Sequence, residues 1–174
     1  SFPKKPLLLT FDDGYIDNLV NAEPLLRKYN MKAHIYLLAN TEFKENTWDT
    51  QTGDQSSPIM SELERKKLDL SIWEIGSHGL DHAKLPEVSD SILRAEIELS
   101  KKMLESEFST KIRSFAYPFG LKNSKVEAEA RKVYDFAVNT DQGALLLADN
   151  PWSIFRVNIF PEDTSFQLRK KTSA

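Results

Sequence analysis

The chain has 174 residues, of which 40% are hydrophobic and 28% charged, an ordinary composition for a globular protein large enough to bury a core. Its formal net charge of −3 gives no electrostatic argument for a nucleic-acid partner, and no apolar stretch approaches the length of a transmembrane helix. Because there are no cysteines and only three histidines, a metal site would have to use histidine and carboxylate ligands.

The N-terminal part of the chain predicts a βαβ unit. Apolar runs over residues 7–11 and 33–38 predict two buried strands, and helical spacing of apolar residues predicts a helix over 17–29 between them. This order is the building unit of a parallel sheet. Residues 40–58 are polar and predict a long loop. Trp48 within this loop would either stack on a sugar ring or pack against the protein body.

Helices and strands continue to alternate along the rest of the chain. Ser61-Glu62-Leu63-Glu64 predicts a capping box at the start of a helix. The further predicted helices and strands cover residues 61–70, 72–75, 89–107, 112–117, 123–134, 136–139 and 155–160. The basic run Arg169-Lys170-Lys171 is predicted to be a frayed tail. With no repeat and no linker, residues 1–174 are predicted to be a single α/β domain with a mostly parallel sheet, either doubly wound or barrel-shaped.

Polar residues follow three of the predicted strands, at the carboxyl ends where parallel α/β folds bind ligands. Asp12 and Asp13 follow the first strand. Ser77-His78 follow the third strand, and Tyr117-Pro118 follow the fourth. We therefore expect these side chains to converge on one face of the sheet.

The histidines His78 and His82 are four residues apart, so a turn would bring both imidazoles to one metal ion. Two histidines and one carboxylate leave coordination positions open, which is typical of catalytic zinc sites. Two surface histidines that happen to be four residues apart are the alternative. The strand end before them, and the use of two of the three histidines in the chain, favour the metal.

The adjacent Asp12 and Asp13 are unusual at the end of a buried strand, because like charges in a half-buried place repel one another. A helix N-terminus would explain one carboxylate but not both. A cation would remove the conflict if one aspartate ligated it and the other accepted a proton. Gly14 would allow the tight turn that this arrangement needs.

Taken together, these motifs resemble the polysaccharide deacetylase family, also called the NodB-homology domain or carbohydrate esterase family 4. Thr10-Phe11-Asp12-Asp13-Gly14 is similar to its first motif, and His78-Gly79-Leu80-Asp81-His82 to the HxxxH of its second. Residues 113–120, RSFAYPFG, are similar to its third motif. The similarity runs from about residue 7 to residue 160.

The resemblance implies a distorted (β/α) barrel and a divalent metal, most often zinc, held by Asp13, His78 and His82. It implies that Asp12 is the general base and that the backbone amide of Tyr117 helps to bind the oxyanion. The implied reaction is attack of metal-bound water on the acetamide carbonyl, which removes N-acetyl groups from an N-acetylated polysaccharide. Such substrates are β-linked N-acetylglucosamine polymers, chitin-like oligomers and peptidoglycan.

The resemblance also implies an extracellular or cell-envelope location. The first residues of this chain carry no pattern of a signal peptide. We expect the chain to be a monomer.

The chain departs from the family pattern in its second and third motifs. Ala116 stands where the family usually has an arginine that orients the base aspartate. Arg156, near the start of the last predicted strand, is either its replacement or a surface arginine. Gly79 stands where serine or threonine often follows the first histidine, so we expect a supporting hydrogen bond to be missing from that loop.

A third departure concerns the general acid, for which the family usually has a late histidine. No histidine follows His82 in this chain. His34, protonated Asp12 or a residue beyond this chain could take that role, although His34 is more typical of a core histidine.

Three other functions remain open. The first is an O-acetyl xylan esterase of the same fold, and the second is a carbohydrate-binding protein of this fold with little catalytic activity. The third is a non-haem iron oxygenase, which also binds its metal through two histidines and one carboxylate. The second of the adjacent aspartates would have no role in an oxygenase, so we rank that function last.

Overall fold

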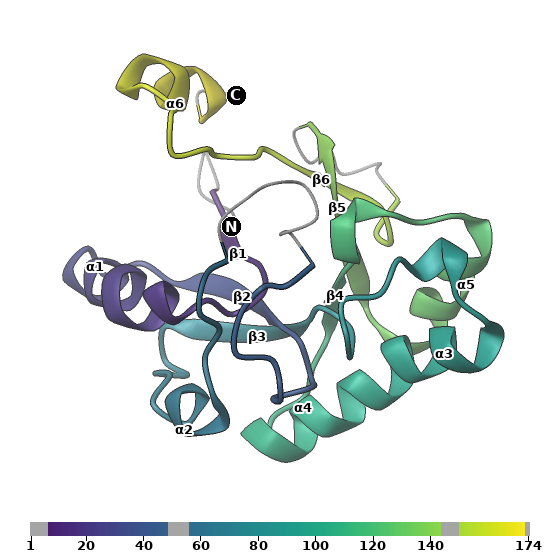
Figure 1. The fold of residues 1–174 in the computed structure, drawn as a ribbon. Coiled ribbons are helices and arrows are strands. Elements are labelled where there is room, and N and C mark those ends of the chain that lie inside the picture. Colours follow the sequence, from purple (N-terminus) through teal and green to yellow (C-terminus); the bar gives the residue numbers. More distant parts are fainter. Residues whose placement is uncertain (1–6, 49–55, 144–149, 173–174) are drawn as a thin grey trace.

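The computed structural model describes residues 7–48, 56–143 and 150–172, and its centre is one sheet of six parallel strands (Figure 1). The strands are β1 (Leu9–Phe11), β2 (Ala33–Leu37), β3 (Trp73–Ser77), β4 (Ser114–Ala116), β5 (Phe136–Gln142) and β6 (Ile154–Arg156). Each strand pairs in parallel with the next one along the chain, so their order in the sheet is their order in the sequence. In a doubly wound sheet, the order of the strands would change direction at one point within the sheet. The sheet instead curls into a half-barrel, which confirms the predicted distorted (β/α) barrel.

Helices and helical turns connect the strands. In chain order they are the π-helical turn η1 (Asn18–Ala22), α1 (Glu23–Lys28), α2 (Glu62–Arg65), the 3-10 turn η3 (Leu85–Glu87), α3 (Asp90–Arg94), the π-helical turn η4 (Ala95–Leu99), α4 (Ser100–Phe108), the 3-10 turn η5 (Pro118–Gly120), α5 (Ser124–Val133) and α6 (Ser165–Lys171). The helix predicted over 61–70 is the shorter α2. Its predicted capping box is present, because the Ser61 N–H donates to Glu64 Oε2 at 2.8 Å.

The main hydrophobic core lies between the sheet and the helices that cover it (Figure 1). Every residue of β2 is buried, as expected for a strand inside a parallel sheet. The segments α3, η4 and α4 follow one another directly and form the helix predicted over 89–107. Its apolar stripe contributes Leu93, Ile97 and Leu104 to the core.

Both ends of the sheet differ from the prediction. The first strand begins at Leu9, and the two residues before it are exposed. The last strand ends at Arg156, although the apolar pattern extends it to Phe160. Val157, Ile159 and Phe160 are exposed and pair with no described strand. The apolar pattern therefore predicted a longer last strand than the sheet contains.

The basic run near the C-terminus is helical, so the prediction of a frayed tail was wrong. Residues 169–171 form the last turn of α6, which projects away from the sheet (Figure 1). The helix starts at a capping box in which the Thr164 N–H donates to Gln167 Oε1 at 2.8 Å. Its last residue, Lys171, pairs with Asp163 at 2.6 Å.

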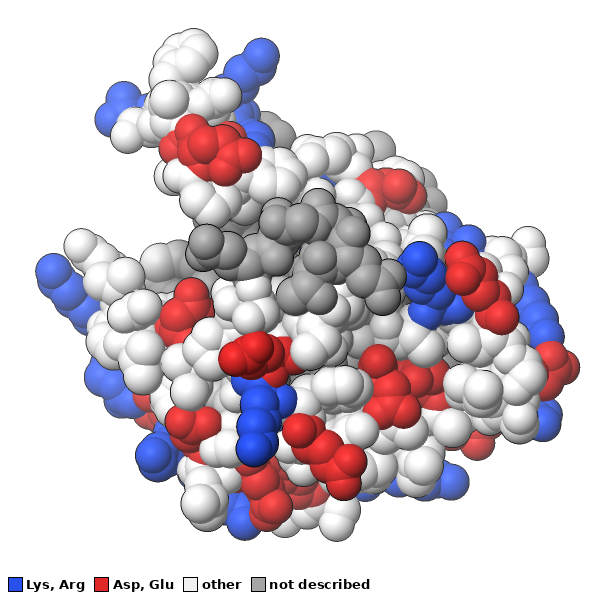
Figure 2. Space-filling model, in the orientation of Figure 1, with Lys and Arg blue, Asp and Glu red and all other residues white. Residues whose placement is uncertain are grey.

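Within the described residues, no helix has the length and apolar character needed to cross a membrane. Figure 2 shows acidic and basic side chains interspersed over one face of the molecule.

Candidate metal and catalytic site

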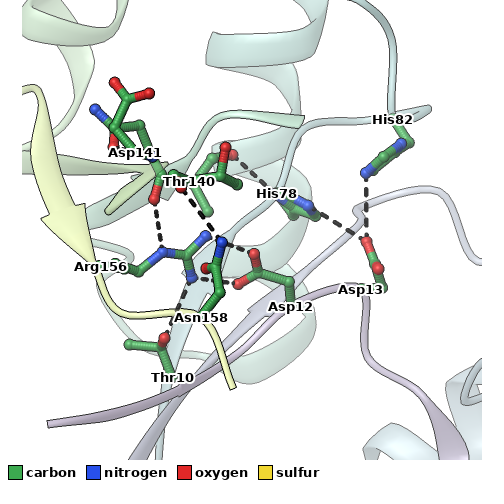
Figure 3. Close-up of polar contacts among 11 residues, drawn as sticks. Thr10, Asp12, Asp13, His78, His82, Thr140, Asp141, Arg156 and Asn158 are labelled. Atoms are coloured by element: carbon green, nitrogen blue, oxygen red, sulfur yellow. Dashed lines mark hydrogen bonds and ion pairs between the residues drawn. The ribbon is translucent and has the colours of Figure 1, made fainter. Parts of the chain in front are cut away.

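The three predicted metal ligands meet at the carboxyl ends of β1 and β3 (Figure 3). Asp13 Oδ1 lies 3.3 Å from His78 Nε2 and 3.4 Å from His82 Nε2. One ligand atom from each of the three residues lies within 4.8 Å of the others. Asp13 Oδ1 is buried and accepts no hydrogen bond from any described residue. A buried carboxylate oxygen without a donor, facing two imidazole nitrogens, fits a divalent cation.

The backbone at two of these ligands is in the left-handed region. Asp13 has a φ of 69° and His82 a φ of 57°, where side chains other than glycine are strained. Gly14 follows with a φ of 80°, and a Cβ there would lie 2.5 Å from the Leu37 side chain. The turn after β1 therefore requires glycine at this position, as predicted. Strain of this kind persists only where the surrounding structure maintains it, and it is concentrated at functional sites.

The ring of His78 is oriented by a second contact. Its Nδ1 lies 2.8 Å from the Ala116 carbonyl oxygen, so Nδ1–H donates to that oxygen and Nε2 is left to face Asp13. Burial opposes the charged form of His78, but the adjacent carboxylates of Asp13 and Asp12 raise its pKa above the ordinary value. Protons would therefore compete with a metal ion for Nε2 at higher pH than they do at an ordinary histidine.

His82 is held differently. Its Nδ1 is buried and has no hydrogen-bond partner among the described residues. Burial, reinforced by the charge of His78, lowers the pKa of His82 to about 3, so this ring is neutral at ordinary pH. The Trp48 ring stacks on it with 4.4 Å between centroids, and the Phe119 ring contacts it edge-on at the same separation. Trp48 thus packs against the body of the protein, at the site itself.

The loop between the two histidines is supported by Glu96 of η4, a residue that was not among the predicted site residues. Glu96 Oε2 accepts the Leu80 N–H at 2.7 Å, and both Glu96 oxygens lie 3.2 Å from the Asp81 amide nitrogen. The loop therefore receives from η4 the support that we expected it to lack at Gly79. The sequence does contain a signal for this role. Glu96 is a charged residue beside Ile97 on the apolar stripe of the helix, and a buried charge is costly unless it has partners.

Gly79 itself suits this arrangement. Its φ is 91°, and a Cβ there would lie 2.6 Å from Glu96 Oε2. A serine or threonine would therefore compete with the carboxylate for the same space.

Asp12 faces Arg156 of β6 (Figure 3). Arg156 Nη1 donates to Asp12 Oδ1 at 2.7 Å and Nη2 donates to Oδ2 at 2.6 Å. The guanidinium is fixed by two further bonds, from Nε to the Asn139 carbonyl and from Nη1 to Thr10 Oγ1. Its side chain is only 13% exposed, so it is not a surface arginine. Burial acts to raise the pKa of Asp12, but the bonds and charge of Arg156 outweigh it and hold that pKa below the ordinary value.

Two other residues considered from the sequence have partners of their own. The Tyr117 N–H donates to the Val138 carbonyl at 3.1 Å, in line with the pairing of β4 and β5. Its role as an oxyanion donor stays a prediction and would require this bond to be shared or broken. His34 is buried, with Nε2 2.7 Å from Ser114 Oγ and its ring stacked on Tyr36. These are the surroundings of a satisfied core histidine.

Comparisons with known proteins point to the family that the motifs resemble. A sequence model of the family "Polysaccharide deacetylase" matches residues 1–134. The chain is 29% identical over 159 residues to YxkH of Bacillus subtilis, named as a polysaccharide deacetylase, covering 91% of this chain and 53% of that protein. It is 24% identical over 176 residues to the poly-β-1,6-N-acetyl-D-glucosamine N-deacetylase of Staphylococcus aureus, covering 95% and 58%. The chain thus spans about half the length of the curated relatives it matches.

A solved structure shares the fold over nearly the whole chain. The Streptococcus pyogenes deacetylase PplD, in complex with acetate, superposes with a TM-score of 0.81 at 25% identity. The match covers 98% of this chain and 71% of that one.

Proposed function

This chain belongs to the polysaccharide deacetylase family, and on that premise we propose that it is a metal-dependent hydrolase that removes N-acetyl groups from an N-acetylated polysaccharide. The observation that carries the proposal is the buried Asp13 Oδ1, which faces two imidazole nitrogens and has no hydrogen-bond donor among the described residues. The similarity to a poly-β-1,6-N-acetyl-D-glucosamine N-deacetylase supports a β-linked N-acetylglucosamine polymer as the substrate class.

Asp13, His78 and His82 would hold the metal. We propose zinc, because two nitrogen ligands and one carboxylate with open coordination positions are typical of catalytic zinc sites. When bound, the metal would polarise the amide carbonyl and lower the pKa of water at the site.

Asp12 is the general base in this proposal. Its lowered pKa keeps it ionised at neutral pH, and the two bonds from Arg156 fix the orientation of its carboxylate. The same lowered pKa makes it a weak base, so its contribution depends on its position beside the metal ligands rather than on its basicity.

The leaving amine must gain a proton when the C–N bond breaks. Of the three histidines, two are the proposed ligands and His34 is bonded to Ser114 in the core. We therefore propose that Asp12 returns to the amine nitrogen the proton it took from the attacking water. The aspartate is then ionised again, and the products are the amine and acetic acid, which leave as ammonium and acetate after the acid ionises.

The test compares Asp12→Asn with wild type for acetate release from N-acetylglucosamine oligomers and for metal content. We expect activity to fall by about 100-fold or more, which is the usual contribution of a general base, with metal content unchanged. Asp135→Asn is the matched control, because Asp135 also pairs with an arginine, Arg113 at 3.1 Å, but in an exposed position. Acetylated xylan assayed in parallel separates amide from ester substrates. Failure of the metal-loaded wild type to release acetate from any acetylated sugar would contradict the proposal.

A further inference from the structure

The two histidines of the site differ in what orients their rings. His78 donates its Nδ1–H to the Ala116 carbonyl, which is the usual support of a metal-ligating histidine. His82 has no such bond among the described residues, although its Nδ1 is buried. Its backbone is also in the left-handed region, with a φ of 57°. Apart from the 3.4 Å contact of Nε2 with Asp13, the orientation of His82 therefore comes from its packing.

The main packing contact is with the Trp48 ring. The two rings lie 4.4 Å apart and are inclined by only 22°, so they are stacked. Phe119 contacts His82 at the same centroid separation but at 68°, and the His78 ring lies at 4.9 Å and 69°. Three aromatic rings of the described residues contact His82. Only the Trp48 ring lies nearly parallel to it and so opposes tilting of the imidazole plane.

Trp48 is itself held in place by the chain on either side of its loop. Residues 44–46 pair with residues 57–59, through Asn46 N–H to the Ser57 carbonyl at 3.2 Å and Ile59 N–H to the Lys44 carbonyl at 2.9 Å. The Phe43 ring meets the indole edge-on at 5.4 Å. The indole Nε1 is buried without a hydrogen-bond partner in the described structure, so ring contacts rather than a hydrogen bond set its position.

We infer that Trp48 is a positioning residue for His82, whose stacking replaces the missing Nδ1 hydrogen bond and raises the metal affinity of the site. The inference rests on the proposed metal site. A ring fixed before binding loses less freedom when the metal binds. An imidazole bound to a cation is also electron-poor, which strengthens its contact with the electron-rich face of the indole. The face of Trp48 that covers His82 is not available to a sugar.

The experiment measures zinc affinity by competition with a chromophoric chelator in wild type, Trp48→Leu, Trp48→Phe and Trp152→Phe. Leucine keeps an apolar side chain but removes the ring, and we expect the zinc Kd to rise by about 10-fold, as for the loss of a supporting contact to a metal ligand. Phenylalanine keeps a ring and should restore affinity close to wild type. Trp152 serves as the control because its ring contacts Arg131 and its Nε1 bonds Tyr134, outside the ligand set.

Tryptophan emission during zinc titration provides a second measurement. The zinc-dependent change should be present in wild type and Trp152→Phe and lost in Trp48→Phe. Wild-type zinc affinity in Trp48→Leu, or an equal emission change in Trp48→Phe and wild type, would overturn the inference alone. A wild-type protein that binds no divalent metal would overturn the proposed function as well.

Discussion

The carboxylates of Asp12 and Asp13 are adjacent in sequence but have different partners. Asp13 faces the two histidines, and Asp12 is held by both terminal nitrogens of Arg156. The left-handed turn at Asp13 and Gly14 makes this divergence possible. The expected repulsion between neighbouring carboxylates is thus relieved on one side by a guanidinium, and in our proposal on the other side by a metal ion.

Replacing Arg156 should reveal this pairing as a pH-dependent loss of stability. The pKa of Asp12 is lower in the folded protein than its ordinary value of 3.8, so its contribution is present above the unfolded pKa and is lost as pH falls through the folded pKa. We expect Arg156→Gln to be less stable than wild type by about 1.5–3 kcal/mol at pH 7, the usual value of a hydrogen bond to a charged group. The difference should shrink below about pH 4, as Asp12 becomes protonated.

Urea unfolding at a series of pH values, with a chelator present to remove metal effects, measures this difference. Arg113→Gln is the control, because its exposed pair with Asp135 should contribute no more than about 1 kcal/mol. A stability loss in Arg156→Gln that is equally large at pH 7 and pH 3 would contradict the assigned cause.

At the scale of elements, the helix over residues 90–108 serves both the core and the site. Its π-helical turn η4 lets two consecutive residues be buried, Ile97 in the core and Glu96 beneath the loop of residues 79–82. Such turns are rare and are often found at functional sites. The regular spacing of apolar residues predicts the apolar stripe of the helix. It does not predict the π-helical turn, which holds one more residue than a regular α-helical turn.

Glu96→Ala should weaken both the fold and the proposed metal site. Removing the acceptor leaves the Leu80 and Asp81 N–H groups without a partner, which we expect to cost about 1–3 kcal/mol of unfolding free energy. Because the loop carries both histidines, zinc affinity should fall by about 10-fold. Urea unfolding and chelator competition measure the two effects.

Glu96→Gln should be milder, because it retains an acceptor oxygen and because burial already raises the pKa of Glu96 toward the neutral form. Glu98→Ala, in the same turn, is the control, because within the described residues Glu98 makes no hydrogen bond or ion pair to the loop. Zinc binding by Glu96→Ala with wild-type affinity would refute the role given to this carboxylate.

In the whole molecule, the site joins parts of the chain that are far apart in sequence. Arg156 of β6 reaches Asp12 and Thr10 of the β1 region and thereby links the first and last strands of the half-barrel. The members of the ion pair are 144 positions apart in the sequence. The ligand cluster joins the end of β1 to the loop after β3. Because these groups meet only in the folded chain, metal binding and folding should be coupled.

Zinc should therefore raise the melting temperature of the wild-type protein. At a free concentration of 100 times the Kd, binding to the folded state alone adds about 2.7 kcal/mol. For a chain of this size we expect the Tm to rise by about 5–10 °C, and a chelator should reverse the shift. Differential scanning calorimetry measures it. Asp13→Ala should show no zinc-dependent shift, and a shift equal to that of wild type would exclude Asp13 as a ligand.

The same experiment should depend on pH. Bound histidines must be neutral. His82 is already neutral at ordinary pH, because burial lowers its pKa to about 3, so protons should compete with zinc at His78. Because the pKa of His78 is raised in the metal-free protein, competition from protons should begin above the ordinary value of 6.5. A zinc-dependent Tm shift that is unchanged at pH 5 would contradict the proposed ligands.

Local sequence patterns were sufficient to predict the order of most helices and strands and the identity of the three clustered residues. Apolar periodicity is a local property, and Asp13, His78 and His82 belong to short motifs in which neighbouring residues carry the signal. The tertiary structure decided between doubly wound sheet and half-barrel, and it alone paired Arg156 with Asp12, placed Glu96 under the histidine loop and stacked Trp48 on His82. These contacts depend on the order and curvature of the strands, which bring distant residues together and which no local pattern of side chains specifies.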